Sequence, residues 1–169
     1  MAVAYYFLIS TALLLLDQVT KHLISEKFSL CVMRPCDTLE ILPVFMLRVH
    51  HNRGAAFSFL DDAGGWQRWF LVTVSTGVSV FIAVWLARLT RQQQLLALAL
   101  AFILGGALGN LVDRAFQGYV VDFLVLHYDS HYFPAFNVAD SAIAVGAALL
   151  ILDMIINGDG TKSATTGSD

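Results

Sequence analysis

The sequence predicts an all-α integral membrane protein with four transmembrane helices, and two observations support this. Of the 169 residues, 57% are apolar and only 14% are charged, whereas soluble domains carry about 25% charged residues. Four stretches are also uncharged or nearly so, and a membrane span needs roughly 20 such residues. These stretches are Val3–Leu16, Trp69–Ala87, Leu95–Val112 and Ser141–Leu152.

The first and last stretches are too short to span alone and must borrow neighbours that include Asp17 and Asp140. We therefore expect these two carboxylates near a membrane face, where water still reaches them. The predicted spans cover residues 3–24, 68–88, 95–113 and 136–156, within a single membrane-embedded domain of residues 1–157.

The N-terminal stretch lacks a basic region and a small-residue cleavage site, and further spans follow it. We therefore predict that Val3–Ile24 is a retained first helix and not a secretory signal. Near its end, Asp17 and Lys21 have the favourable i, i+4 order of an acid and a base. A surface ion pair and a functional role at the membrane rim both fit this spacing.

Residues 25–67 form a mixed polar insertion. Within it, Glu40–Leu42 and Phe45–His50 alternate loosely, which predicts short strands. Asn52-Arg53-Gly54 is typical of a turn. The apolar run Ala55–Leu60 is too short to span, and it could lie in the membrane interface or cover a site.

Two cysteines, Cys31 and Cys36, lie in the polar part of this insertion. They could pair if the loop faces an oxidising compartment, but the sequence does not show whether they do. We interpret them as ordinary loop cysteines.

The short loop Arg88–Gln94 predicts the orientation. Its arginines favour the cytoplasm under the positive-inside rule, in which short loops weigh most. Trp66, Trp69 and Trp85 bracket the second span as interfacial anchors would. Both termini would then be cytoplasmic, with residues 158–169 as a disordered tail, and residues 25–67 would face outward. The insertion holds more Lys and Arg than the short loop, but long loops are translocated with less regard to charge.

Small residues recur at intervals of four in the last two spans. Gly105 and Gly109 have this spacing in the third span, and Ala142 and Gly146 have it in the fourth. Such residues let helices approach closely, which predicts a compact bundle and not a wide pore.

Composition and spacing also exclude some partners. The net charge is −3, without a basic stripe, so we expect no nucleic-acid partner. His127 and His131 have the i, i+4 interval of a helical metal pair, but the residues between them are typical of a loop. No ligand set completes a site, so we predict neither a metal nor a cofactor.

Polar clusters mark the facing ends of the last two spans. Asn110, Asp113 and Arg114 occupy positions i, i+3 and i+4, and Asn137, Asp140 and Ser141 repeat that spacing. Each trio falls on one helical face. Between the clusters, Asp122 lies inside the apolar run Tyr119–Leu126 of the connection.

Among these acids, Asp122 and Asp140 have no charged residue within four positions, whereas Asp113 precedes Arg114 and Asp17 has Lys21 one turn on. Two carboxylates held close disfavour joint ionisation, so one keeps its proton. Such a pair can activate a water and protonate a carbonyl oxygen. Asp122 and Asp140 are therefore our candidate catalytic pair.

A nucleophilic serine is the competing chemistry. Ser58 and Ser141 are candidates by residue type, but neither lies in a nucleophile elbow or a Ser-x-x-Lys pattern.

Five blocks of the chain, in order, resemble the signature blocks of the bacterial lipoprotein signal peptidases (signal peptidase II). They are Asp17-Gln18-x-x-Lys21, Asn52-x-Gly54-Ala55-Ala56-Phe57-Ser58, Gly105-Gly106-Ala107-Leu108-Gly109-Asn110-Leu111-x-Asp113-Arg114, Val120-Val121-Asp122-Phe123 and Phe136-Asn137-x-Ala139-Asp140-Ser141. The chain departs from the family pattern at Arg53, where a small or polar residue is common, and in its short N-terminal tail.

The resemblance implies an aspartyl endopeptidase of the bacterial inner membrane. That family cuts prolipoproteins just before a diacylglyceryl-modified cysteine, without a cofactor, and we expect a monomer in contact with membrane lipids. The family's catalytic acids fall on Asp122 and Asp140. Its supporting residues fall on Asp17, Lys21, Asn52, Gly54, Asn110, Asp113, Arg114, Asn137 and Ala139. The family fold adds a small extracytoplasmic β-sheet and a short amphipathic helix, which suits Glu40–Leu60.

Two other classes remain open. A small proton-coupled transporter would also bury carboxylates, although four spans without an internal repeat are few for one. A membrane scaffold would explain the glycine spacing but not the pair of acids.

Overall fold

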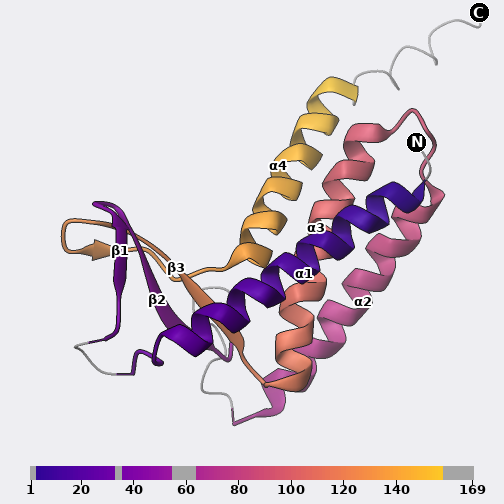
Figure 1. Ribbon diagram of the computed structural model, residues 1–169. Coiled ribbons are helices and arrows are strands. Elements are labelled where there is room, and N and C mark those ends of the chain that lie inside the picture. Colours follow the sequence, from indigo (N-terminus) through magenta and orange to yellow (C-terminus); the bar gives the residue numbers. More distant parts are fainter. Residues whose placement is uncertain (1–2, 33–35, 55–63, 158–169) are drawn as a thin grey trace, which may run out of the picture.

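The computed structural model describes residues 3–32, 36–54 and 64–157. Its four long helices are α1 (Val3–Lys27), α2 (Trp66–Arg88), α3 (Gln94–Phe116) and α4 (Val138–Asn157) (Figure 1). Each is long and apolar enough to cross a membrane. The prediction of four transmembrane helices is therefore confirmed.

The helices form a bundle with a sheet at one end. The start of α1, the α2–α3 connection and the end of α4 lie together at the opposite end (Figure 1). Helix α3 is central, because 56% of its apolar window is buried, against 17% in each of the other three helices. An apolar core between α1, α2 and α3 includes Tyr6, Ile82, Leu86 and Leu100.

Small residues set the spacing around α3. A Cβ added at Gly105 would lie 2.8 Å from the carbonyl oxygen of Ser10 on α1. A Cβ at Gly106 would collide with the carbonyl oxygen of Ala139 on α4, and one at Gly146 would lie 2.8 Å from that of Ala99. The close packing that the glycine spacing predicts is therefore present on both sides of α3.

The sheet has four antiparallel strands in the order β1-β2-β3-β4. They are β1 (Leu39–Leu42), β2 (Phe45–Asn52), β3 (Val120–Tyr128) and β4 (His131–Tyr132). The first two lie where the sequence predicts strands. The other two come from the connection between α3 and α4, so the insertion supplies only half of the sheet.

Strand β3 was not predicted, because Tyr119–Leu126 was interpreted as a simple apolar connection. Four consecutive residues, Val120–Phe123, are buried. A strand covered on both faces loses the alternation of apolar and polar residues that identifies half-buried strands.

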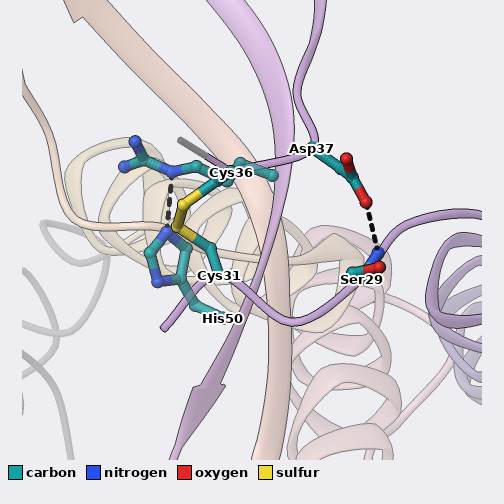
Figure 2. Close-up of a disulfide and its surroundings, with 6 residues drawn as sticks. Ser29, Cys31, Cys36, Asp37 and His50 are labelled. Atoms are coloured by element: carbon teal, nitrogen blue, oxygen red, sulfur yellow. Dashed lines mark hydrogen bonds between the residues drawn. A yellow bond between two sulfur atoms is a disulfide. The ribbon is translucent and has the colours of Figure 1, made fainter. Parts of the chain in front are cut away.

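Cys31 and Cys36 form a disulfide, so their interpretation as ordinary loop cysteines is wrong (Figure 2). The disulfide lies beside His50 of β2 in this view. Strand β1 pairs with β2 only as far as Leu47. Beyond that point the amide of Cys31 donates to the carbonyl of Val49 at 3.0 Å. Cys31 therefore continues the hydrogen bonding along this edge of β2 beyond the start of β1.

The predicted short amphipathic helix and disordered tail fall largely on residues 55–63 and 158–169, which lie outside the described residues.

Candidate active site

Buried polar side chains gather where the helices meet the sheet. Each of six such residues is at most 7% exposed. They are Asp17, Lys21, Asn110, Asp113, Asp122 and Asn137. Burying this many polar groups costs free energy unless they form hydrogen bonds or ion pairs with one another. The partners of each side chain therefore indicate its role.

Lys21 holds one group of these acids, which we call the lysine cluster (Asp17, Lys21 and Asp113). Its Nζ lies 2.7 Å from Asp17 Oδ2 and 2.9 Å from Asp113 Oδ2. It also donates to Asn110 Oδ1 at 3.0 Å. Asp17 is fully buried and Lys21 is 3% exposed. The alternative of a surface ion pair at the end of α1 is therefore excluded.

The cation partner of Asp113 differs from the one that the sequence suggested. Arg114 makes no ion pair with Asp113 in the described structure, where Lys21 occupies that place. Adjacent residues on a helix point in different directions, so sequence neighbours do not face each other. Arg114 instead donates from Nη2 to the carbonyl oxygen of Gly54 at 3.0 Å.

The lysine cluster joins several elements. Asp17 Oδ1 accepts from the amide of Ala139 at the start of α4 at 2.9 Å. Asp113 Oδ2 accepts from the amide of Val121 in β3 at 3.3 Å. Gln18 Nε2 donates to Asp113 Oδ1 at 2.8 Å, a contact that the site prediction missed. Its place in the block Asp17-Gln18-x-x-Lys21 was the signal that could have found it.

Asp122 and Asp140 form the second group, which we call the amide-held pair. Asp122 Oδ1 accepts from Asn137 Nδ2 at 2.7 Å, and its Oδ2 accepts from Asn52 Nδ2 at 3.1 Å. Asp140 Oδ1 accepts from Asn110 Nδ2 at 2.7 Å, and its Oδ2 accepts from the backbone amide of Asn137 at 3.2 Å. None of the ion pairs between described residues involves either acid.

The start of α4 and the pairing of β2 with β3 position the side chains of the amide-held pair. Asn137 caps α4: its Oδ1 accepts from the amide of Asp140 at 2.9 Å while Asp140 accepts in return, which is a reciprocal capping box. On the sheet, Asp122 of β3 lies opposite His50 of β2. Asn52, two residues further along β2, shares the face of His50 and reaches the carboxylate.

Burial raises the pKa of the Asp122 carboxyl to about 7, and the charge of the nearby Asp140 adds to the rise. The amides of Asn52 and Asn137 act against this shift. A carboxyl with such a pKa exists in both protonation states near neutral pH, as a general acid or base requires.

Both acids face one open cleft of about 500 Å³. Asn52, Asn110 and Arg114 add polar groups to its lining. The remaining lining is apolar and comes from β3, from residues 133–136 and from α4. The arrangement can hold a peptide carbonyl and a water between two carboxyls, beside an apolar wall.

Two other candidate chemistries, a metal site and a nucleophilic serine, can be checked in the described residues. Within residues 3–32, 36–54 and 64–157, no group of three His, Cys, Asp or Glu could hold a metal ion. Ser141 Oγ donates to the carbonyl of Asn137 at 2.9 Å and so belongs to the start of α4. Ser58 lies outside the described residues.

The family model described as signal peptidase (SPase) II matches residues 9–156. The chain belongs to the signal peptidase II family. It is similar to the lipoprotein signal peptidase of Teredinibacter turnerae, with 49% identity over 167 residues that cover 99% of this chain and 95% of the relative. The lipoprotein signal peptidase of Alteromonas mediterranea is also 49% identical, over 161 residues covering 95% and 85% of the two chains.

The fold of this signal peptidase II family member is also similar to a solved structure. A bacterial membrane enzyme determined by the in meso method matches with a TM-score of 0.79 and 26% identity, covering 98% of this chain and 95% of that one. The chain is therefore a membrane protease that cleaves lipoprotein signal peptides. The transporter and scaffold alternatives have no support from these matches.

Proposed function

We propose that this signal peptidase is an aspartyl endopeptidase in which Asp122 and Asp140 activate a water. It cuts the prolipoprotein immediately before a cysteine that carries diacylglycerol. The observation that carries this proposal is the amide-held pair: buried Asp122 and half-buried Asp140 share Asn137, face one cleft and have no cationic partner among the described ion pairs.

The proposed chemistry assigns one proton to the pair. Asp122, with its pKa of about 7, is the neutral acid, and Asp140 is the anion. A water attacks the scissile carbonyl carbon and gives a proton to Asp140, while Asp122 protonates the carbonyl oxygen. Collapse of the tetrahedral intermediate breaks the C–N bond, and the leaving nitrogen takes the proton from Asp140. The hydroxyl proton returns to Asp122.

The surrounding residues orient the pair. Asn137 fixes the two acids relative to each other, and Asn52 and Asn110 each hold one of them. Arg114 lines the cleft, and its buried Nε has no hydrogen-bond partner among the described residues. We assign it to binding a substrate carbonyl. The lysine cluster, with Ala139 as a backbone partner, holds the elements in place, and Arg114 binds the carbonyl of Gly54.

The lining of the cleft supports a lipid-modified substrate. Leu126, Phe133, Ile143 and Ala144 form an apolar wall next to the acids. An acyl chain can bury apolar surface against this wall, which favours binding by roughly 25 cal/mol for each Å² removed from water.

Two observations support an outward-facing site in the bacterial inner membrane, with both termini cytoplasmic. The disulfide lies at the sheet end, and disulfides persist in oxidising compartments such as the periplasm. The short arginine-containing loop between α2 and α3 lies at the other end (Figure 1).

The deciding experiment uses purified full-length protein and two synthetic prolipoproteins, identical except that only one carries diacylglycerol on its cysteine. We expect cleavage of the modified substrate before the lipidated cysteine, identified by mass spectrometry, and little cleavage of the other. Equal rates on both would contradict the substrate assignment. Activity should persist in EDTA, and loss of activity restored by zinc would contradict the two-aspartate mechanism.

Orientation is tested separately. A cysteine introduced at exposed Tyr128 should react with a membrane-impermeant thiol reagent in intact cells, and one introduced at Gln93 should not. The reverse pattern would place the cleft on the cytoplasmic side.

A further inference from the structure

Asn110 of α3 lies between the lysine cluster and the amide-held pair and bonds to both. Its Oδ1 accepts from Lys21 Nζ at 3.0 Å, and its Nδ2 donates to Asp140 Oδ1 at 2.7 Å. Asn110 is 7% exposed and Lys21 is 3% exposed, so their bond is largely shielded from water. The ammonium group of Lys21 therefore reaches one acid of the pair through a single amide.

The orientation of the Asn110 amide follows from its surroundings. Its Oδ1 lies beside two donors, Lys21 Nζ at 3.0 Å and Asn137 Nδ2 at 3.2 Å. A turned amide would place its NH₂ group against the ammonium, which has no acceptor to offer it. Such a turn would also take an acceptor away from a buried cation. The donor end of Asn110 therefore points to Asp140.

Of the two donors, Lys21 holds this orientation more strongly than Asn137 does. A hydrogen bond from a charged donor is roughly twice as strong as one between neutral groups. The Nδ2 of Asn137 is neutral, and it also donates to Asp122 Oδ1 at the shorter distance of 2.7 Å. Its bond to Asn110 is therefore the weaker of the two.

The orientation of Asn110 determines which acid can carry the shared proton. With its Nδ2 toward Asp140, Asn110 offers a donor, and an ionised carboxylate accepts it. A turned Asn110 would offer an acceptor, and Asp140 would need a proton to bond to it. The proton would then lie on the acid that has to accept one from water. It would be missing from Asp122, which has to donate one to the carbonyl oxygen.

We propose that Lys21 is a positioning residue for the peptidase reaction. By fixing Asn110, it keeps Asp140 ionised as the proton acceptor of the pair, in addition to its part in stability. The inference rests on the proposed function, since it assumes that Asp122 and Asp140 perform the chemistry. Two further charged groups act on Asp140 from the same cleft, Asp122 of β3 and Arg114 of α3. Both are retained in the Lys21 and Asn110 variants that test the proposal.

The test is the pH dependence of kcat/KM, measured on full-length protein with the diacylglyceryl prolipoprotein. The acid limb of this profile reports the group that must be ionised in the free enzyme. Lys21→Met should move the acid limb to higher pH by about one unit, as expected when a charge-assisted hydrogen bond is lost. Lys27→Met, exposed at the end of the same helix, should leave the limb in place. A purely structural lysine would lower the whole profile through lost folded protein, without moving its limbs.

A double-mutant cycle separates the route through Asn110 from a direct effect of the Lys21 charge. That charge also acts at Asp122, where it works against the rise in pKa that burial causes. Asn110→Leu leaves both ion pairs of Lys21 in place and should itself move the acid limb up by about one unit. Adding Lys21→Met to it should move the limb little further, because the connection is already cut. Fully additive shifts would overturn the proposal.

A charge-balanced variant guards against a failure of Lys21→Met to fold. Lys21→Met/Asp113→Asn removes one charge of each sign, so the net charge of the lysine cluster is unchanged, and it should show the same shift as Lys21→Met. An acid limb that stays in place in this variant and in Asn110→Leu would refute the role of Lys21. The proposed function would survive that result if Asp140→Asn is inactive. A folded, active Asp140→Asn would refute the proposed function, and this inference with it.

Discussion

Where the helices meet the sheet, two groups of carboxylates share residue type but differ in their partners. In the lysine cluster, Asp17 and Asp113 lie within 3 Å of one ammonium group. In the amide-held pair, Asp122 and Asp140 receive only neutral N–H donors in the hydrogen bonds described above. A cation stabilises the ionised form of an acid, whereas neutral donors permit a proton to be held and exchanged. This difference supports our proposal that the first group serves the structure and the second serves proton transfer.

The largest expected effect is a loss of kcat when either acid of the amide-held pair is replaced. Asp122→Asn, Asp140→Asn and the double variant should each lose at least about 10³-fold in kcat, because one unit of general acid and base is destroyed in all three. The effects should be strongly non-additive. Cleavage of the diacylglyceryl prolipoprotein measures them, and Asp153→Asn, far along α4, should stay within about twofold of the unmodified rate. A folded Asp140→Asn with normal turnover would refute the pair.

Lys21→Met should instead remove stability. It leaves Asp17 and Asp113 buried without their cation, and breaking a buried ion pair costs about 3–5 kcal/mol. Thermal unfolding in detergent measures the loss. Exposed Lys27→Met should change the free energy of unfolding by less than about 0.5 kcal/mol.

Removing all three charges of the lysine cluster sharpens this result. Lys21→Met combined with Asp17→Asn and Asp113→Asn should be more stable than Lys21→Met alone, because no uncompensated charge remains. A triple variant less stable than the single one would show that the cluster acts through its hydrogen bonds and not its charge.

The pH dependence of stability should also separate the groups. The pKa of Asp122 is raised from 3.8 to about 7, so between these values the folded protein binds a proton that the unfolded chain has lost. The free energy of unfolding therefore falls as pH rises from 4 to 7, by up to about 4 kcal/mol from this group. Denaturant titrations across this range should show a slope that Asp122→Asn reduces. An unchanged slope would contradict the raised pKa.

The protonation of Asp122 should also determine how kcat depends on pH. Above pH 7 Asp122 loses the proton that it donates to the carbonyl oxygen, so kcat should fall on the alkaline side. At low pH the pair loses its single negative charge, which gives a bell-shaped profile that belongs to both acids together. A rate that rises steadily from pH 7 to pH 9 would contradict Asp122 as the general acid.

The smallest effect is expected at the disulfide. Cys31→Ser/Cys36→Ser should lose about 2 kcal/mol, the chain-entropy expectation for a loop this short. Thermal unfolding measures it, and adding a dithiol reductant to the unmodified protein should produce a similar shift. Because Cys31 donates to Val49 through its backbone, kcat should change little. A loss in kcat as large as that of Asp122→Asn would mean that the loop positions the acids.

The sequence by itself determined the four helices and the strands β1 and β2, because length, apolarity and alternation are local properties of the chain. It also singled out Asp122 and Asp140 as a candidate pair, since acids without charged neighbours in an apolar setting stand out locally. That assignment stays a prediction. Strand β3 was missed because burial on both faces removes the alternating pattern.

Only the tertiary structure decided which partner each polar side chain has. Lys21 reaches Asp113, although the sequence suggested Arg114 as the partner of Asp113. Asn137 touches both acids because residue 136 pairs with Leu124 of β3 and brings the start of α4 beside the sheet. Cys31 and Cys36 form a disulfide, and the amide of Cys31 binds the carbonyl of Val49 in β2. These contacts depend on how distant segments pack and on where side chains point, and neither is encoded in the spacing of neighbouring residues.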